Sequence, residues 1–156
     1  MKISIRKGLG FGLTSGIITT LGLIVGINSG THSKILLIYS ILVIAIADSL
    51  SDSLGIHISE EAGRKNLPKR ELWESTLSTL IFKLFFTLSF IVIIFFLELN
   101  IAIIASVIYG LLLLAFFSYY IAEKNNTSPT KAVLEHLLIA IFVITLTHFL
   151  GRFFQI

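Results

Sequence analysis

The chain has 156 residues, of which 55% are hydrophobic and only 13% are charged, and its mean hydropathy is +0.95. In a typical soluble domain about a quarter of the residues are charged. The core of a chain of this size cannot enclose so many apolar side chains, so a lipid bilayer is expected to solvate part of them. The net charge of +3 is too small and too dispersed to indicate a nucleic-acid partner, and the absence of cysteine excludes disulfides and thiolate metal sites.

Five apolar stretches, each near the roughly 20 residues that cross the hydrocarbon layer, divide the chain. They predict an all-α integral membrane protein that forms one transmembrane domain over residues 1–156, with helices over 9–27, 35–58, 75–97, 101–122 and 132–149. The first stretch follows a basic segment, as a signal peptide does. It is long, however, and no small-residue cleavage site follows it, so the sequence predicts a retained helix.

The first predicted helix carries glycines at four-residue spacing and ends in the turn-rich segment 28–31. The glycines are Gly8, Gly12, Gly16, Gly22 and Gly26. Small residues at this spacing let helix backbones approach closely in lipid. The spacing leaves open whether the close packing occurs within one chain or across a homodimer.

Two carboxylates, Asp48 and Asp52, interrupt the second predicted helix. Because they are four residues apart, they lie on one helix face, one turn from each other. A charge within a membrane span is costly unless it faces protein or water, so a cation, a proton or a basic side chain should neutralise the pair. Paired carboxylates with nearby hydroxyls suit a divalent cation or protons. Lys83, within the predicted third helix, offers the alternative of a purely structural ion pair.

A polar segment, predicted to be cytoplasmic, covers residues 59–74 after the second helix. His57, Glu60 and Glu61 lie where this helix is expected to leave the membrane. A histidine followed by carboxylates can collect a metal ion at such a mouth. The alternative is an ordinary solvated helix end.

The later connections are short. The turn at 98–100 makes the third and fourth helices antiparallel neighbours, and the Asn-Asn and Ser-Pro pairs in residues 123–130 predict a loop. The chain contains no glycine-rich phosphate loop, no His-Glu-x-x-His and no nucleophile elbow, so the sequence does not predict an enzyme.

The basic residues predict the orientation of the five spans. Nine of them flank the helices on the side of the N-terminus, namely Lys2, Arg6, Lys7, Arg64, Lys65, Lys69, Arg70, Lys124 and Lys131. Lys34 and Arg152 are on the other side. The positive-inside rule therefore predicts a multi-pass protein, of the cell membrane if prokaryotic, with the N-terminus and segments 59–74 and 123–130 in the cytoplasm and the C-terminus outside.

Four short motifs resemble those of the vacuolar iron transporter family, which also includes nodulin-like and yeast iron and manganese carriers. Residues 13–27 (LTSGIITTLGLIVGI) resemble its Asp-Gly-hydrophobic-Thr opening and following Val-Val-Gly-Val. Residues 51–59 (SDSLGIHIS) are similar to its Ser-Met-Ala-x-Gly-Glu-Tyr-x-Ser. Residues 110–131 resemble its Leu-Phe-x-x-Gly segment before a Ser-Pro, and residues 147–152 (THFLGR) its Tyr-x-x-Gly-Arg/Lys. The likeness implies the five-span fold and a homodimer in the bilayer. It also implies export of a divalent cation such as Fe²⁺ or Mn²⁺ from the cytoplasm, with or without proton coupling. Such a protein needs no resident cofactor.

The chain departs from that family at the metal path. Ser15 stands at the position of the family's aspartate in the first helix, Asp52 at that of its methionine, and Ile56 at that of its glutamate. The family's glutamate-rich insert is reduced to residues 59–74. The expected metal-binding residues are Asp48, Asp52 and Ser15 in the membrane, with Glu60 and Glu61 capturing the ion. The alternative is a non-transporting membrane protein of the same fold with a structural or partner-binding role.

Overall fold

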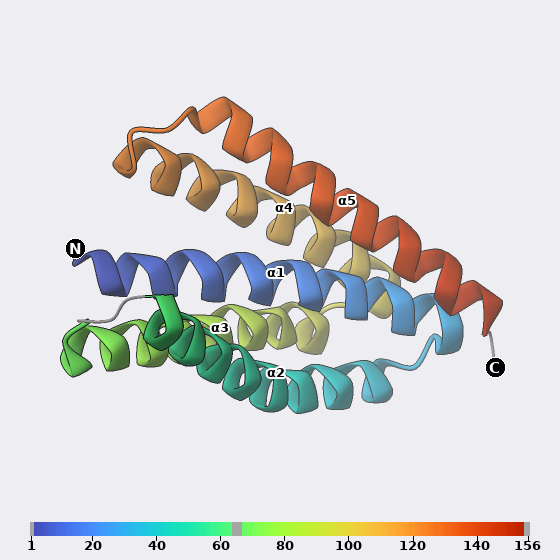
Figure 1. The fold of residues 1–156 in the computed structure, drawn as a ribbon. Helices are drawn as coiled ribbons and strands as arrows, with labels where there is room; N and C mark the ends of the chain where they lie inside the picture. The colour runs from blue at the N-terminus through green and yellow to red at the C-terminus, as the bar shows by residue number, and fades with distance from the viewer. Residues whose placement is uncertain (1, 64–66, 155–156) are drawn as a thin grey trace.

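A computed structural model describes residues 2–63 and 67–154 of the chain. Over these residues the chain is all-helical, with short connections and no strand (Figure 1). The helices are α1 (Ile3–Thr31), α2 (Lys34–Gly63), α3 (Lys69–Phe96), α4 (Leu99–Lys124) and α5 (Pro129–Phe153). All five are long and apolar enough to cross a membrane, as expected for a multi-pass membrane protein.

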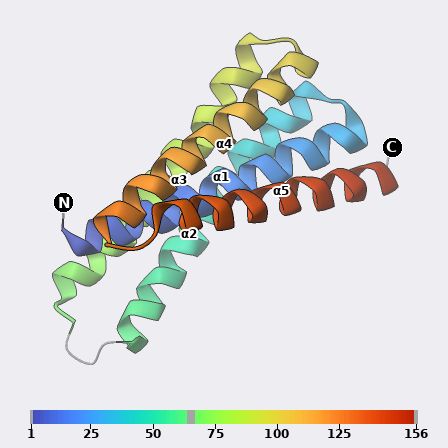
Figure 2. The ribbon, with the colours of Figure 1, turned by 90° about the horizontal axis from the view of Figure 1, so that it is seen from above.

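Helix α1 is the centre of the bundle. It packs against α3 and α2 on one side and against α5 and α4 on the other (Figures 1 and 2). Its fully buried apolar side chains recur every three or four residues, at Leu13, Ile17, Leu21 and Ile24. This spacing keeps them on one helix face. That face and the glycine-rich faces leave α1 with little surface to expose, so the other four helices form the outside of the bundle.

The glycines of α1 provide close packing within the chain. A Cβ atom on Gly12 would lie 2.6 Å from the backbone oxygen of Thr79 in α3, and one on Gly22 would lie 2.8 Å from the Val143 side chain in α5. Gly8 and Gly16 also face α3, and Gly26 and Gly30 also face α5. Of the two alternatives left open by the spacing, the structure uses the intrachain one. The glycines therefore no longer support a homodimer, which stays a prediction on other grounds.

The predicted turn at residues 28–31 is wrong. Helix α1 continues to Thr31, and the chain reverses at His32, whose φ of 52° is left-handed and whose N–H donates to the Asn28 oxygen at 3.2 Å. Two contacts favour the extra helical turn. The Thr31 hydroxyl donates to the Ile27 oxygen at 3.0 Å, and Gly30 packs against Gly151 of α5.

Each helix begins before the apolar run that predicted it, and all except α3 also end beyond that run. Much of the polar segment 59–74, predicted to be cytoplasmic, is helical, because α2 ends at Gly63 and α3 begins at Lys69. Residues 64–66 of that segment lie outside the described residues. Hydropathy marks the part of a helix suited to hydrocarbon, whereas backbone hydrogen bonding continues into the polar flanks.

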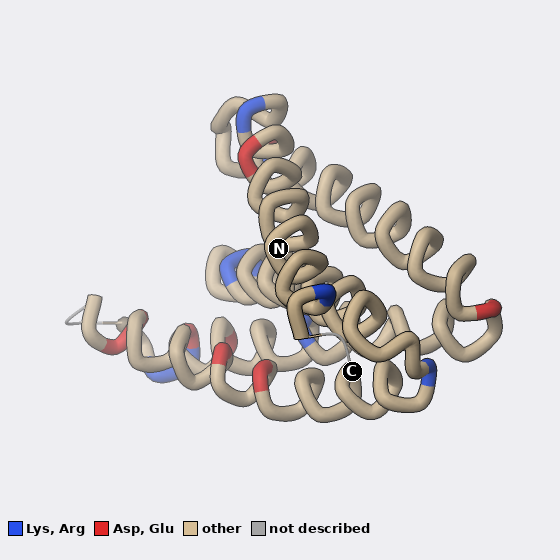
Figure 3. Tube along the Cα trace, turned by 90° about the vertical axis from the view of Figure 1, so that its right-hand side faces the viewer, with Lys and Arg blue, Asp and Glu red and all other residues tan. Residues whose placement is uncertain are grey.

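The outer surface of the bundle is strongly apolar. Large side chains on the outer helices are more than half exposed, among them Ile46, Phe85, Ile104 and Phe142. Figure 3 shows that lysine, arginine, aspartate and glutamate occupy only short stretches of the trace. Soluble monomers rarely expose so much contiguous apolar surface, whereas lipid covers it without cost.

Candidate functional site

The two aspartates of α2 converge on one buried lysine of α3. The Lys83 ammonium lies 2.5 Å from an oxygen of Asp48 and also forms an ion pair with Asp52. The Lys83 side chain is 1% exposed, whereas those of Asp48 and Asp52 are 30% and 23% exposed. The cluster is thus closed on the α3 side and partly open on the α2 side.

Ser15 of α1 completes this cluster. Its hydroxyl donates to Asp52 at 2.6 Å and accepts from the Lys83 ammonium at 2.9 Å. An ammonium group has three donors, and here it has three oxygen partners, from Asp48, Asp52 and Ser15. We call these four residues the Asp–Lys cluster.

Local sequence explains how three helices contribute to one point. The four-residue spacing stacks the aspartates on the side of α2 that faces α3 and α1. Gly16 leaves room for the lysine stem, because a Cβ atom there would lie 3.3 Å from Cγ of Lys83. The small residue next to Ser15 thus lets a long side chain run along the α1–α3 interface to the carboxylates.

The charge balance of the Asp–Lys cluster favours a cation. Two carboxylates and one ammonium leave one net negative charge. A buried ion pair gains Coulomb energy only by losing hydration, so it is weak evidence for a stabilising role. The cluster nevertheless satisfies the lysine fully while leaving oxygen atoms of both aspartates partly accessible.

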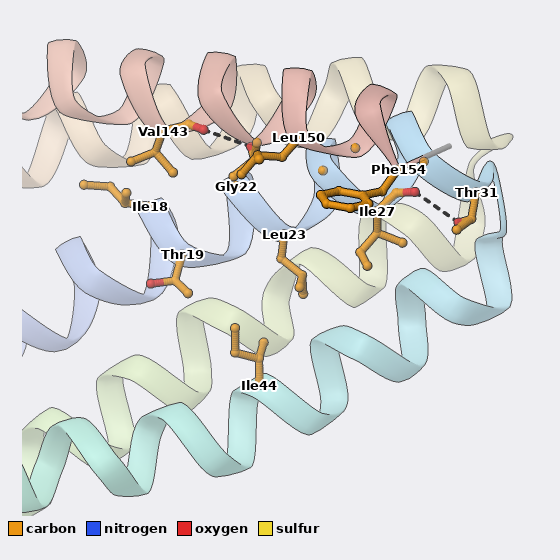
Figure 4. A pocket seen from close by; sticks show the side chains of 14 residues that line it. Ile18, Thr19, Gly22, Leu23, Ile27, Thr31, Ile44, Val143, Leu150 and Phe154 are labelled. Carbon is orange, nitrogen blue, oxygen red and sulfur yellow. Dashed lines mark hydrogen bonds between the residues drawn. The ribbon is translucent and has the colours of Figure 1, made fainter. Parts of the chain in front are cut away.

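A groove leads along α2 to Asp48. It has a volume of about 500 Å³ and is lined by Leu23, Tyr39, Ser40, Val43, Ile44, Ala47, Asp48 and Ser51. An apolar groove of about 750 Å³ lies beside it, between α1 and α5, and shares Leu23 and Ile44 with it (Figure 4). In Figure 4 these two side chains project into the space between α1 and α2. Both grooves lie on the half of α1 that is remote from the N-terminus.

The predicted metal-collecting mouth is not assembled. Glu60 pairs with Lys7 of α1 at 2.7 Å, and Glu61 is exposed. His57 instead bonds through Nδ1 to the Thr76 hydroxyl of α3 at 2.9 Å and packs edge-on against Trp73 at 4.8 Å between ring centroids. Within residues 2–63 and 67–154, no three or more histidine, aspartate or glutamate side chains gather to hold a metal ion.

Ion pairs instead tie the helices together at the N-terminal end of the bundle. Glu74 of α3 accepts from Lys2 at 2.5 Å and from Ser4 at 2.8 Å, both at the start of α1, and from Arg70 at 3.0 Å. With the Lys7–Glu60 pair, these contacts join α1 to α2 and α3 on the far side of the Asp–Lys cluster from the two grooves.

Sequence reasoning found all four members of the cluster but not their arrangement. The sequence suggests Lys83 as a partner for one aspartate, whereas the ammonium bridges both and also contacts Ser15. Sequence reasoning missed the bonds of His136 to Ser118 and of His148 to Ser29, each at 2.7 Å between neighbouring helices. Nothing local in the sequence indicates these contacts, because the partners are 18 and 119 residues apart.

The chain was compared with models of protein families, with curated proteins and with solved structures, and none of the three comparisons gives a match. The resemblance of the four motifs to the vacuolar iron transporter family therefore stays an expectation. The function must be argued from the Asp–Lys cluster itself.

Proposed function

We propose that this protein is a multi-pass membrane carrier that moves a divalent cation, of the iron and manganese kind, out of the cytoplasm. Asp48 and Asp52 would be the cation ligands, with Ser15 lining the path beside them. One observation carries the proposal: two carboxylates converge within helices suited to a membrane, keep partly accessible oxygens, and carry one negative charge more than their lysine neutralises. Charges within membrane spans are expensive, so a functional role is the default hypothesis for them.

The access to the cluster agrees with this role. Asp48 lines a groove that is also lined by three hydroxyl-bearing residues, Tyr39, Ser40 and Ser51. Oxygen ligands of this type suit hard divalent cations, which are held by carboxylates, hydroxyls and water. The resemblance of residues 13–27 and 51–59 to iron-transporter motifs supports the same class of cargo.

A second candidate is a non-transporting membrane protein of the same fold. The observation in its favour is that Lys83 already gives each carboxylate an ion-pair partner. In that case the Asp–Lys cluster would only hold α2 and α3 together, and the surface would serve assembly or a partner.

Flux into liposomes separates the two candidates. Purified protein is reconstituted, Mn²⁺ or Fe²⁺ is added outside, and a metal-sensitive dye reports uptake. We expect metal-dependent flux from the natural chain and none from Asp52→Asn, which keeps the size of the side chain and removes its charge. Glu135→Gln is the matched control, because Glu135 is 58% exposed and its only close partner is Lys131 at 3.8 Å within the described residues. Natural flux from an Asp48→Asn, Asp52→Asn double variant would refute the transport proposal.

A further inference from the structure

We infer that Lys83 is a tethered cation that competes with the transported ion for Asp48 and Asp52, and that this competition determines which ions the site accepts. The inference rests on the proposed transport function and adds a specificity-determining residue to it. Its basis is the position of the ammonium, which forms ion pairs with both carboxylates and donates hydrogen bonds to Asp52 and Ser15.

The ammonium occupies the place that a bound ion would need. A divalent cation shared by two carboxylates lies about 2.0–2.6 Å from their oxygen atoms. The Lys83 nitrogen is 2.5 Å from Asp48 and is also bonded to Asp52. Lys83 contacts Oδ2 of each aspartate, and two cations cannot hold these same two oxygens at once. An ion that bridges the aspartates through them therefore requires the ammonium to move away.

The charge of the site differs between two states, one with the Lys83 ammonium in place and one with the ammonium withdrawn. With the ammonium in place the carboxylates retain one net negative charge, which is half of what a divalent ion requires. With the ammonium withdrawn they offer two negative charges, which match a divalent ion. A monovalent ion brings no more charge than the ammonium that it displaces, and the tether keeps that ammonium at a high effective concentration. Lys83 should therefore exclude Na⁺ and K⁺ more strongly than divalent ions.

The surroundings allow the lysine to withdraw. Its stem is a flexible four-carbon chain that passes Gly16, where a Cβ atom would lie 3.3 Å from Cγ of Lys83. The hydroxyl of Thr87 lies beside the same glycine and accepts from Thr20 at 3.4 Å. A hydroxyl oxygen has two lone pairs, so this buried polar site can still accept a bond from a displaced ammonium.

The test compares Mn²⁺ and Na⁺ binding to the purified natural chain and to Lys83→Met by titration calorimetry. We expect Lys83→Met to bind Mn²⁺ at least about tenfold more tightly and to gain measurable Na⁺ binding. Lys34→Met is the matched control, because the Lys34 ammonium donates to the backbone oxygens of Phe95 and Leu97 at 3.1 and 2.8 Å and should leave both affinities unchanged. A purely structural lysine would not alter the preference for Mn²⁺ over Na⁺.

A second variant guards against misfolding of Lys83→Met. Lys83→Met with Asp48→Asn keeps the net charge of the site and removes the competitor, so we expect Asp52 to bind Na⁺ there as well. Folded variants with unchanged Mn²⁺ affinity and no Na⁺ binding would overturn the competition, while Mn²⁺ flux by the natural chain would leave the transport proposal standing. If the natural chain shows no flux and neither variant binds Mn²⁺, both proposals fail together.

Discussion

At the scale of single residues, removing one partner from the Asp–Lys cluster should cost much stability, because its lysine is almost completely buried. Lys83→Met leaves Asp48 and Asp52 without their cation, and breaking a buried pair in this way costs about 3–5 kcal/mol. Adding Asp48→Asn and Asp52→Asn removes the unpaired charges, so most of the lost stability should return. Thermal unfolding in a mild detergent measures both effects. A single variant as stable as the natural chain would show that the cluster contributes little.

The hydroxyl of Ser15 should contribute less than the ion pairs. It donates to Asp52 and accepts from Lys83, so Ser15→Ala removes one bond from each group. Because the ions remain paired with each other, we expect a loss of about 1–2 kcal/mol, measured by the same unfolding assay. Ser51→Ala, at an exposed position of α2, is the control and should have no effect. An equal loss in the two variants would mean that the bonds of Ser15 add nothing specific.

At the scale of helices, the α1–α3 contact depends on glycine backbone-to-backbone packing. A Cβ atom on Gly12 would lie 2.6 Å from the Thr79 oxygen and 3.1 Å from the Lys83 nitrogen of the backbone, neither of which can move aside. We expect Gly12→Ala to lower stability by about 1–3 kcal/mol through overpacking. Gly55→Ala is the matched control, since no described residue lies within 4 Å of its Cβ position, and it should gain about 0.5–1 kcal/mol from helix propensity. The two variants should therefore change stability in opposite directions. A Gly12→Ala protein as stable as the natural chain would contradict the observed packing.

The number and order of the helices were predictable because each helix contains one apolar run long enough to cross a bilayer. Their ends were not, because the helical hydrogen bonds of residues 59–63 and 69–74 continue outside the apolar part. The turn at 28–31 was mispredicted for a tertiary reason, since the contact of Gly30 with Gly151 of α5 supports a helical turn that the local sequence disfavours.

The candidate site was predictable in its members and not in its bonding. A charge in an apolar run is conspicuous, so Asp48, Asp52 and Lys83 stand out in the sequence. Which of them meet depends on how far α2 slides along α3, and this register is set by packing of the whole bundle. The same dependence explains why the sequence does not predict the ion pair of Glu60 with Lys7.

At the scale of the whole molecule, the role of the glycines bears on oligomeric state. Because Gly12 and Gly16 face α3 of the same chain, their enlargement should disturb folding before it disturbs association. We therefore expect Gly12→Ala to keep the particle mass of the natural protein, measured by light scattering in mild detergent. The homodimer implied by the family resemblance would have to use another surface. A shift from dimer to monomer in this variant would instead indicate that the glycine face of α1 lies in a dimer interface.

The five helices also determine where the two ends of the chain lie. An odd number of spans places the termini on opposite sides, and Figure 1 shows them at opposite ends of the bundle. The end that holds the N-terminus also holds the helix ends on either side of the α2–α3 and α4–α5 connections, and there the guanidinium of Arg6 donates to the Lys124 oxygen at 2.8 Å. The described basic residues at that end are Lys2, Arg6, Lys7, Lys69, Arg70, Lys124 and Lys131. Lys34 and Arg152 lie at the other end.

This asymmetry predicts the orientation in the membrane. Short loops rich in lysine and arginine stay in the cytoplasm, so the N-terminus should be cytoplasmic and the C-terminus external. Fusions of a reporter that is active only in the cytoplasm, and of one active only outside, to each terminus test this directly. The cytoplasmic reporter should be active only at the N-terminus and the external one only at the C-terminus. Opposite activities would reverse the predicted orientation, and the groove that Asp48 lines would then lie in the cytoplasmic half. The same side at both ends would mean that one of the five helices does not cross the bilayer.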